Sequence, residues 1–420
     1  MRSMRLAAAI ALFSFSLHAA DPITAVRFNK LWDGSRVVDG ALVIIQKGRI
    51  QSVAGGNPAA PPGATIIDWS HYYGLPGLID VHTHMTYYWD REPGTRPLGQ
   101  NRMAAITVFL AQENARRTLE AGVTTVRDLG SSEYTDIAMR DLINRGAMIG
   151  PRMFVCGYGL SVPPRPQRPG APVNLSPGSA DSPDEVVKAV RRQVNAGADV
   201  IKMYGSVGGF DNVNTTQTFT YEEMKSAVDT AHFLGKKIAI HSYGPEGARD
   251  AVRAGTDSLE HAIDIDDATL ALMVKQGTYY VPTIDHNRYY VDARGEYQFA
   301  AGAETRLNAY IERNFETARR AYKAGVKFAM GSDAVYTMFG QNTGELAWFV
   351  KAGMTPEQAL KTATVNAADL LGKSADLGSA SPGHFADLIA VEGDPLADIA
   401  VAIGKVRAVM KGGAVVVAPK

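Results

Sequence analysis

The sequence predicts an α/β protein: a (β/α)8 barrel, or TIM barrel, with a small β-sandwich domain that is built from both termini. Three observations support this fold class. Eight apolar, β-rich runs alternate with helical patterns in the middle of the chain. Short β-type runs occur both before and after this region. Finally, His, Lys or Asp residues stand where five of the eight runs end, which is unusual for apolar barrel strands.

Composition narrows the possible functions. The 420 residues include 43 basic and 43 acidic side chains, so the formal charge is zero. Binding to nucleic acid or to an anionic membrane surface needs a basic excess, so neither partner is expected. The single cysteine, Cys156, excludes an internal disulfide and a thiolate zinc cluster. A metal site would therefore depend on the nine histidines and on carboxylates.

Residues 1–20 have the pattern of a secretory signal peptide. Arg2 and Arg5 precede an apolar segment at 6–17, and small residues stand just before Asp21. A buried N-terminal helix is the alternative. No later segment is long and apolar enough for a transmembrane helix, so no membrane anchor is expected. The prediction is a secreted or periplasmic protein.

Residues 21–75 and 377–420 are expected to form the composite β-sandwich domain. Gly and Pro separate short runs of alternating and β-branched residues in both segments. The clearest runs are 41–45, 64–68, 387–391 and 414–417. Strands at both ends around a different middle suggest one domain assembled from the two termini.

Residues 76–376 are expected to form the barrel. The strands are predicted at 78–82, 124–128, 153–157, 200–204, 238–242, 258–262, 279–283 and 327–333. Helices are predicted at 102–121, 183–196, 221–234 and 304–324, and Thr355 begins a further helix. An open doubly wound sheet is the alternative, but its glycine fingerprint is absent after the first strand.

Polar residues at the strand ends predict a site. The carboxyl ends of barrel strands converge on one face, so residues distant in sequence can meet there. His82 and His84 end the first strand on one face because side chains alternate. The other strand-end residues are Lys202, His241, His261 and Asp333. Each alone could be a core histidine, an ion-pair lysine or a helix-capping aspartate, but their shared position favours a common site.

The segment 77–84, with Lys202, His241, His261 and Asp333, resembles the binuclear metal-dependent amidohydrolase superfamily. The segment 382–388 is similar to that superfamily's return into its β-sandwich. The resemblance covers almost the whole mature chain. It is strongest to the imidazolonepropionase-related branch, which includes Xaa-Pro and Xaa-Arg/Lys dipeptidases and ochratoxin-hydrolysing amidases.

This resemblance implies two divalent metal ions, usually Zn²⁺. By the family's pattern His82, His84 and Asp333 hold the first metal, and His241 and His261 hold the second. Lys202 is then N6-carboxylysine, whose two carbamate oxygens bridge the metals. A hydroxide between the metals is the expected nucleophile. Asp333 is the expected catalytic residue that passes its proton to the leaving amine.

The expected partner is a small-molecule or dipeptide substrate. Tyr243 lies two residues beyond His241, and the resemblance gives it a role in catalysis and substrate binding. Arg288, in the expected loop after the seventh strand, is predicted to bind a substrate carboxylate. The predicted function is hydrolysis of an amide in a dipeptide or N-acyl amino acid, including ochratoxin-like amides. Relatives are often oligomers, so a homo-oligomer is expected.

Other functions remain open at this point. The same site could hydrolyse a cyclic amide such as an imidazolone or lactam, a carbamate or an ester. A mononuclear deaminase fits less well, because that branch typically lacks the bridging lysine that Lys202 supplies. From another class, the chain could be a non-catalytic binding protein with a retained metal site. Such proteins have lost ligands, whereas all six are present here.

Overall fold

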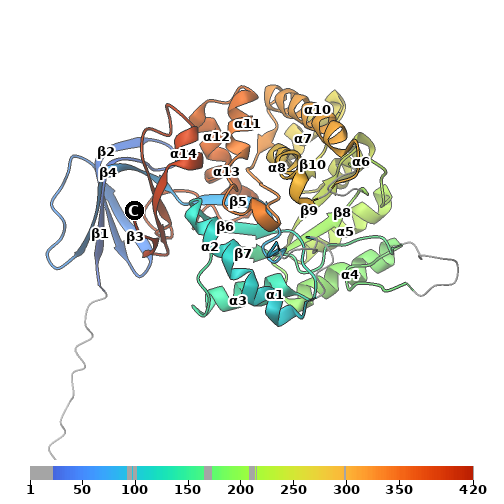
Figure 1. Cartoon of the computed structure of the whole chain (residues 1–420), viewed down its shortest axis with the longest axis horizontal. Helices are drawn as coiled ribbons and strands as arrows, with labels where there is room; N and C mark the ends of the chain where they lie inside the picture. Colours follow the sequence, from blue (N-terminus) through green and yellow to red (C-terminus); the bar gives the residue numbers. More distant parts are fainter. Residues whose placement is uncertain are drawn as a thin grey trace, which may run out of the picture.

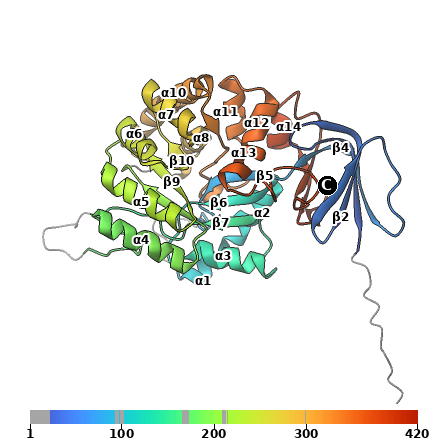
Figure 2. The same ribbon diagram turned by 180° about the vertical axis from the view of Figure 1, so that it is seen from behind.

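The structure is a computed structural model that describes residues 22–91, 97, 102–164, 173–207, 213, 215–297 and 299–419. The predicted signal peptide, residues 1–20, lies outside these described residues. The described chain forms a ring of strands surrounded by helices, with a further β-sheet to one side (Figures 1 and 2).

A barrel strand forms in each of the eight predicted segments, and some of these strands are shorter than predicted. Three parallel strands make one arc in the order β5–β6–β7, and five make a second arc in the order β12–β11–β10–β9–β8. Their bounds are β5 (Leu78–Thr83), β6 (Val123–Asp128), β7 (Arg152–Val155), β8 (Val200–Tyr204), β9 (Lys237–Ser242), β10 (Ser258–His261), β11 (Tyr279–Val281) and β12 (Lys327–Phe328). Most of their residues are buried, as expected of parallel strands covered by helices.

Hydrogen bonds join the two arcs on both sides. At the first seam, the backbone N–H of Tyr204 donates to the carbonyl of Leu160 at 2.9 Å. At the second seam, the N–H of Asp333 donates to the carbonyl of His82 at 2.7 Å. The predicted (β/α)8 barrel is confirmed, with the two arcs meeting at the Leu160–Tyr204 seam and the His82–Asp333 seam.

Helices surround the barrel (Figures 1 and 2). They are α1 (Ala104–Leu110), α2 (Gln112–Glu120), α3 (Thr135–Asn144), α4 (Pro183–Ala196), α5 (Tyr221–Phe233), α6 (Pro245–Ala254), α7 (Asp267–Gln276), α8 (Ile284–Asp292), α9 (Arg294–Tyr297), α10 (Ala303–Ala324), α11 (Glu345–Lys351), α12 (Pro356–Thr362), α13 (Val365–Leu370) and α14 (Ala400–Gly404). Local chemistry sets several helix starts. Thr220 and Thr355 each close a capping box with the residue three positions later.

Two elements differ from the sequence prediction. The single helix expected at 102–121 is interrupted at Ala111, where neither Gly nor Pro marks a break. The eighth strand ends at Phe328, well before residue 333. Beyond it the chain runs closely past β5, because a Cβ on Gly331 would lie 2.8 Å from that of His82. This tight crossing needs a glycine and replaces the regular strand ladder.

Strands from both termini form one seven-stranded sheet, in the order β15–β14–β13–β4–β1–β2–β3 (Figure 1). Their bounds are β1 (Thr24–Trp32), β2 (Val37–Gln46), β3 (Arg49–Ala54), β4 (Thr65–Pro76), β13 (Leu388–Val391), β14 (Val406–Lys411) and β15 (Ala414–Val417). The sheet has its own apolar core, in which the rings of Phe28 and Trp69 meet edge to face at 5.6 Å. The two terminal segments thus share one sheet, and β4 leads through Gly77 directly into β5.

No helix in the described part of the chain is both long enough and apolar enough to cross a lipid bilayer.

Candidate metal centre

The six predicted ligands meet at the carboxyl ends of the barrel strands. They come from β5 and the residue that follows it, from β8, β9 and β10, and from the segment after β12. All six are buried, with exposed fractions of 8% or less. The ring of His261 lies 5.0 Å from that of His82 and 4.5 Å from that of His241. The residues are His82, His84, Lys202, His241, His261 and Asp333.

His82, His84 and Asp333 fit a single metal ion. One ligand atom from each residue lies within 4.8 Å of the other two, the only such group among the described residues. Oδ1 of Asp333 lies 3.2 Å from Nε2 of His84 and 3.5 Å from Nε2 of His82. Zinc bonds of about 2.0–2.2 Å in a tetrahedron separate neighbouring ligand atoms by about 3.4 Å. The donor set and its spacing therefore suit such an ion.

Two predicted ligands, one at the end of β10 and one in the segment after β12, have left-handed backbone conformations. His261 has φ 73° and Asp333 has φ 53°. This region is costly for residues other than glycine, by about 1–2 kcal/mol each, and persists only where the surrounding structure enforces it. At these positions it turns the ligand side chains out of the strand direction and toward the shared site.

Glu260 orients His82 from behind. Its Oε2 lies 2.7 Å from Nδ1 of His82, so the imidazole presents Nε2 to the metal site. Its Oε1 accepts a hydrogen bond of 2.9 Å from Nη2 of Arg127. Burial opposes ionisation, but Arg127 and His82 outweigh it and hold the pKa of Glu260 at about 2. The carboxylate therefore remains charged and holds His82 in one tautomer.

Two other ligands are oriented in a similar way. Nδ1 of His84 lies 3.1 Å from the carbonyl oxygen of Gly130, and Nδ1 of His261 lies 2.7 Å from Oγ1 of Thr283. Each contact occupies the nitrogen that faces away from the site. Burial lowers the pKa of His241 and His261 well below the usual range. Both imidazoles are therefore neutral, the form that binds a metal.

Asp80 fixes the segment that carries Asp333. Its Oδ1 accepts from the backbone N–H of Ser332 at 2.9 Å, and its Oδ2 accepts from the Ser332 hydroxyl at 2.5 Å. Nδ2 of Asn342 donates to the same Oδ2 at 3.0 Å. Asp80 belongs to β5, so these bonds hold Asp333 beside the histidines of that strand.

Lys202 is a buried amine without an acidic partner. Its Nζ lies 3.4 Å from Nε2 of His82, and its exposed fraction is 1%. In the part of the chain that the structure describes, no carboxylate lies within ion-pair distance of this Nζ. Burial lowers its pKa below the ordinary lysine value. A buried unpaired ammonium is costly, so this position favours a neutral or chemically altered amine.

Tyr243 lies at the site, as the sequence predicts. Its ring packs against those of His241 at 4.5 Å and His261 at 5.3 Å. Burial raises the pKa of its hydroxyl above the ordinary tyrosine range. The hydroxyl therefore keeps its hydrogen and can donate it to a bound group.

Arg288 is not brought to the ligands. The expected loop is helix α8, and the Arg288 guanidinium binds Asp285 through Nε at 2.6 Å and Nη2 at 3.0 Å, and also binds Asp292. It lines a separate cavity of about 550 Å³ with Gln341 and Trp348, and none of the six ligands lines that cavity. Two carboxylates on its own helix hold Arg288, so its predicted role in binding a substrate carboxylate gains no geometric support.

His286 is a site residue that the sequence reasoning did not assign. Its Nε2 lies 3.3 Å from Oδ2 of Asp333, and its exposed fraction is 6%. A histidine directly after the seventh barrel strand is a signal that could have indicated it.

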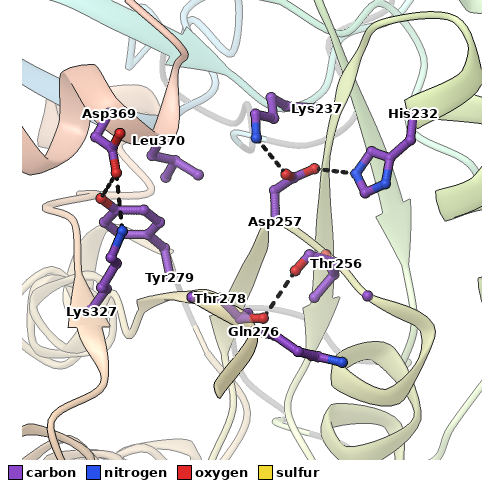
Figure 3. A pocket seen from close by; sticks show the side chains of 12 residues that line it. His232, Lys237, Thr256, Asp257, Gln276, Thr278, Tyr279, Lys327, Asp369 and Leu370 are labelled. Atoms are coloured by element: carbon purple, nitrogen blue, oxygen red, sulfur yellow. Dashed lines mark hydrogen bonds and ion pairs between the residues drawn. The ribbon is translucent and has the colours of Figure 1, made fainter. Parts of the chain in front are cut away.

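The opposite end of the barrel has a pocket of about 430 Å³ (Figure 3). Its charged groups are already paired: Asp257 with Lys237 and His232, and Asp369 with Lys327. Lys237, Tyr279 and Lys327 in this pocket begin strands, whereas the six ligands lie farther along or beyond their strands, toward the carboxyl end of the barrel. Figure 3 shows these ion pairs. Residues at the amino ends of barrel strands usually serve stability, so we interpret this network as structural.

Comparisons with known proteins identify the family of this chain. The amidohydrolase family matches residues 73–416. Ochratoxinase from Aspergillus niger is 32% identical over 361 residues, covering 78% of this chain and 72% of that protein. A solved Xaa-Pro dipeptidase with methionine bound in its active site has a TM-score of 0.85 at 32% identity, covering 94% of this chain and 99% of its own.

A second solved structure, a prolidase complexed with N-methylphosphonate-L-proline, has a TM-score of 0.83 at 26% identity. It covers 94% of this chain and 100% of its own. The family match spans the barrel, including every predicted ligand, and it reaches the C-terminal strands β13, β14 and β15 of the terminal sheet. The chain belongs to the amidohydrolase family.

Proposed function

We propose that this chain is a binuclear, zinc-dependent hydrolase of the amide bond in a dipeptide or an N-acyl amino acid. The observation that carries the proposal is the convergence of four histidines, one aspartate and one unpaired buried lysine on a single barrel face. Six such residues are more than a single metal needs. They are enough for two metals that share one bridging ligand.

Lys202 is proposed to carry the bridge. A neutral amine adds to carbon dioxide, forming a C–N bond and releasing one proton, and the product is a carbamate whose single negative charge is shared by two oxygens. An ammonium cannot bind a cation, whereas each carbamate oxygen can hold one. The position of Nζ, 3.4 Å from Nε2 of His82 and without an acidic partner, supports this change.

We assign His82, His84 and Asp333 to the first metal and His241 and His261 to the second. Imidazole and carboxylate donors suit zinc, although other divalent ions accept the same set. When bound, such metals supply an acidified water and polarise a substrate carbonyl.

The chain's own residues are proposed to supply the remaining chemistry. Asp333 can take a proton from attacking water and return it to the leaving amine, because one carboxylate oxygen faces the ligand histidines. Tyr243 can donate its hydroxyl hydrogen to the carbonyl oxygen on which negative charge develops.

The relatives support the proposed substrate class. One similar structure holds methionine in its active site, and another is complexed with N-methylphosphonate-L-proline. An aromatic wall next to the ligands suits a compound with an apolar body. Tyr87 stacks on His84 at 4.7 Å and on Tyr336 at 6.0 Å.

The test is a library of dipeptides and N-acyl amino acids assayed before and after metal removal by a chelator. We expect turnover by the isolated protein, close to two metals per chain, loss of activity with the chelator, and recovery with Zn²⁺. The variant Lys202→Ala should lose metal and activity, whereas Lys275→Ala, on the exposed face of α7, should lose neither. Turnover by metal-free protein would contradict the mechanism. Turnover of lactams or esters alone would contradict the substrate class.

We also propose export from the cytoplasm and self-association. The proposal of export depends on the composition of residues 1–20. N-terminal sequencing of protein from the extracytoplasmic fraction should find a chain that lacks these residues, and an intact N-terminus in the cytosol would contradict export.

Self-association is tested by light scattering of the purified protein, which should give a mass above that of one chain.

A further inference from the structure

His286 faces the one carboxylate oxygen that the ligand histidines leave unused. Oδ1 of Asp333 faces His82 and His84, whereas Oδ2 lies 3.3 Å from Nε2 of His286. The two oxygens of Asp333 therefore have different neighbours. A carboxylate only accepts hydrogen bonds, so a bond in this contact requires the hydrogen on Nε2 of His286.

The other ring nitrogen agrees with that tautomer. Nδ1 of His286 is buried and has no hydrogen-bond partner among the described residues. A buried N–H without an acceptor is costly, so Nδ1 is best placed without a hydrogen. The ring of Tyr290 packs edge-on at 4.5 Å and fills the space beside His286.

His286 does not join the ligands. The described chain contains one group whose ligand atoms all come within 4.8 Å of one another, and His286 is not in it. Its contact with the site is through Asp333. His286 is therefore placed to hold Asp333 in position and not to bind the metal itself.

The surrounding structure fixes His286. It lies in the first turn of α8, and Glu345 accepts hydrogen bonds from the first two helical N–H groups, of Ile284 at 3.0 Å and Asp285 at 2.8 Å. The α8 start thus has both N–H groups satisfied by one buried carboxylate. Gly344 allows this approach, because a Cβ there would lie 2.2 Å from Oδ2 of Asp285.

The start of α8 is also tied to a ligand. Thr283, which precedes the helix, has φ 51°, and its Oγ1 lies 2.7 Å from Nδ1 of His261. One short segment therefore orients His261 through Thr283 and contacts Asp333 through His286. Because α8 is held by Glu345 at its first N–H groups and by the contact of Thr283 with His261, the position of His286 next to Asp333 is fixed.

We propose that His286 is a positioning residue for Asp333. Its Nε2–H binds Oδ2 and fixes the plane of the carboxylate, so that Oδ1 stays turned toward His82 and His84, the residues that would hold a metal with it. The expected effect on kcat rests on the proposed function. The contact between the side chains of His286 and Asp333 does not depend on that function.

The test compares two neutral amide variants of equal polarity. In His286→Gln the side-chain amide reaches the place of Nε2, whereas in His286→Asn it reaches only the place of Nδ1. Each protein is loaded with Co²⁺, and the visible absorption of the metal, the metal content and the kinetics on the best amide substrate are measured.

We expect Gln to keep the wild-type cobalt spectrum and a kcat within about fivefold of wild type. Asn should shift the spectrum and lower kcat by about 10–100-fold with little change in KM, as other supports of metal ligands do. Both variants should keep two metals. The proposal is overturned if both variants match wild type, if both are impaired alike, or if either loses a metal.

The cobalt spectrum does not depend on the substrate. If the wild-type enzyme hydrolyses no amide, the proposed function fails, but the spectra of the Gln and Asn variants still decide the role of His286.

Discussion

Oε2 of Glu260 lies 2.7 Å from Nδ1 of His82, although 178 residues separate them in the sequence. The same carboxylate binds Arg127, and all three side chains are almost fully buried. One buried acid therefore does two things: it orients His82, a proposed metal ligand, and it neutralises a guanidinium in the barrel interior.

Glu260→Gln should weaken both functions. The amide of Gln has one acceptor oxygen for three donors, from His82, Arg127 and Ser258, and it leaves a buried cation without its counter-ion. We expect a loss of about 3–5 kcal/mol of unfolding free energy and a drop of about 10–100-fold in metal affinity. Denaturant unfolding and chelator competition measure the two effects. Glu316→Gln, in an exposed pair with Arg319, should change stability by no more than about 0.5 kcal/mol, and equal losses in both variants would argue against this role.

Lys202 should give a carbamate signal. Protein equilibrated with ¹³C-bicarbonate is expected to show one carbamate carbon resonance by NMR, which Lys202→Arg should lack because a guanidinium does not add carbon dioxide. The Arg variant should also bind fewer metals, since its permanent charge repels a cation. Two metals bound per wild-type chain after complete removal of carbon dioxide would rule out the bridge.

Tyr243→Phe should lower kcat/KM by about 100-fold or more, because a donor to the developing negative charge is lost. Metal content should stay the same, since the ring and its packing against the histidines remain. Tyr310→Phe is the matched control: its ring packs against Tyr243 at 5.4 Å, and its hydroxyl lies 3.4 Å from the carbonyl of His261. If both variants lose activity equally, the effect is one of packing.

Glu345 should make stability depend on pH. Burial raises its pKa from 4.5 to about 8. Between these values the folded protein keeps a proton that the unfolded chain has released, so stability decreases as pH rises. The contribution is fully present below about pH 4.3 and is lost as pH rises through about 8, with a size on the order of a few kcal/mol.

Unfolding of wild type and Glu345→Gln across about pH 5–9 isolates this group, because Gln does not titrate. The stability of wild type relative to the variant should fall over this range. Glu312→Gln, on the exposed face of α10, should leave the slope unchanged. A difference between wild type and Glu345→Gln that does not vary with pH would show that Glu345 titrates normally.

Much of the fold could be predicted because its signals are local. The run at 200–204 predicts β8, which the structure has at Val200–Tyr204, and the pattern at 183–196 predicts α4 with the same bounds. Strand direction then determines that polar strand ends share one face. This is why the six ligands could be proposed before their contacts were known.

The site contacts that the sequence did not predict depend on segments that are distant in the chain. Nothing near Glu260 in the sequence indicates that it reaches His82, and His286 meets Asp333 only after the barrel closes. Arg288 differs, because its partners were visible. Asp285 and Asp292 stand three residues before and four residues after it, a helical spacing that predicts ion pairs along one helix face.

The His82–Asp333 seam has a consequence for the whole barrel. His82 belongs to the three-stranded arc, and Asp333 follows the last strand of the five-stranded arc. A metal held by both side chains would cross-link the two arcs of strands. Metal binding and barrel closure would then be linked reciprocally. A bound ion would oppose separation of the two arcs, and strain that separates the arcs would lower the affinity for the ion.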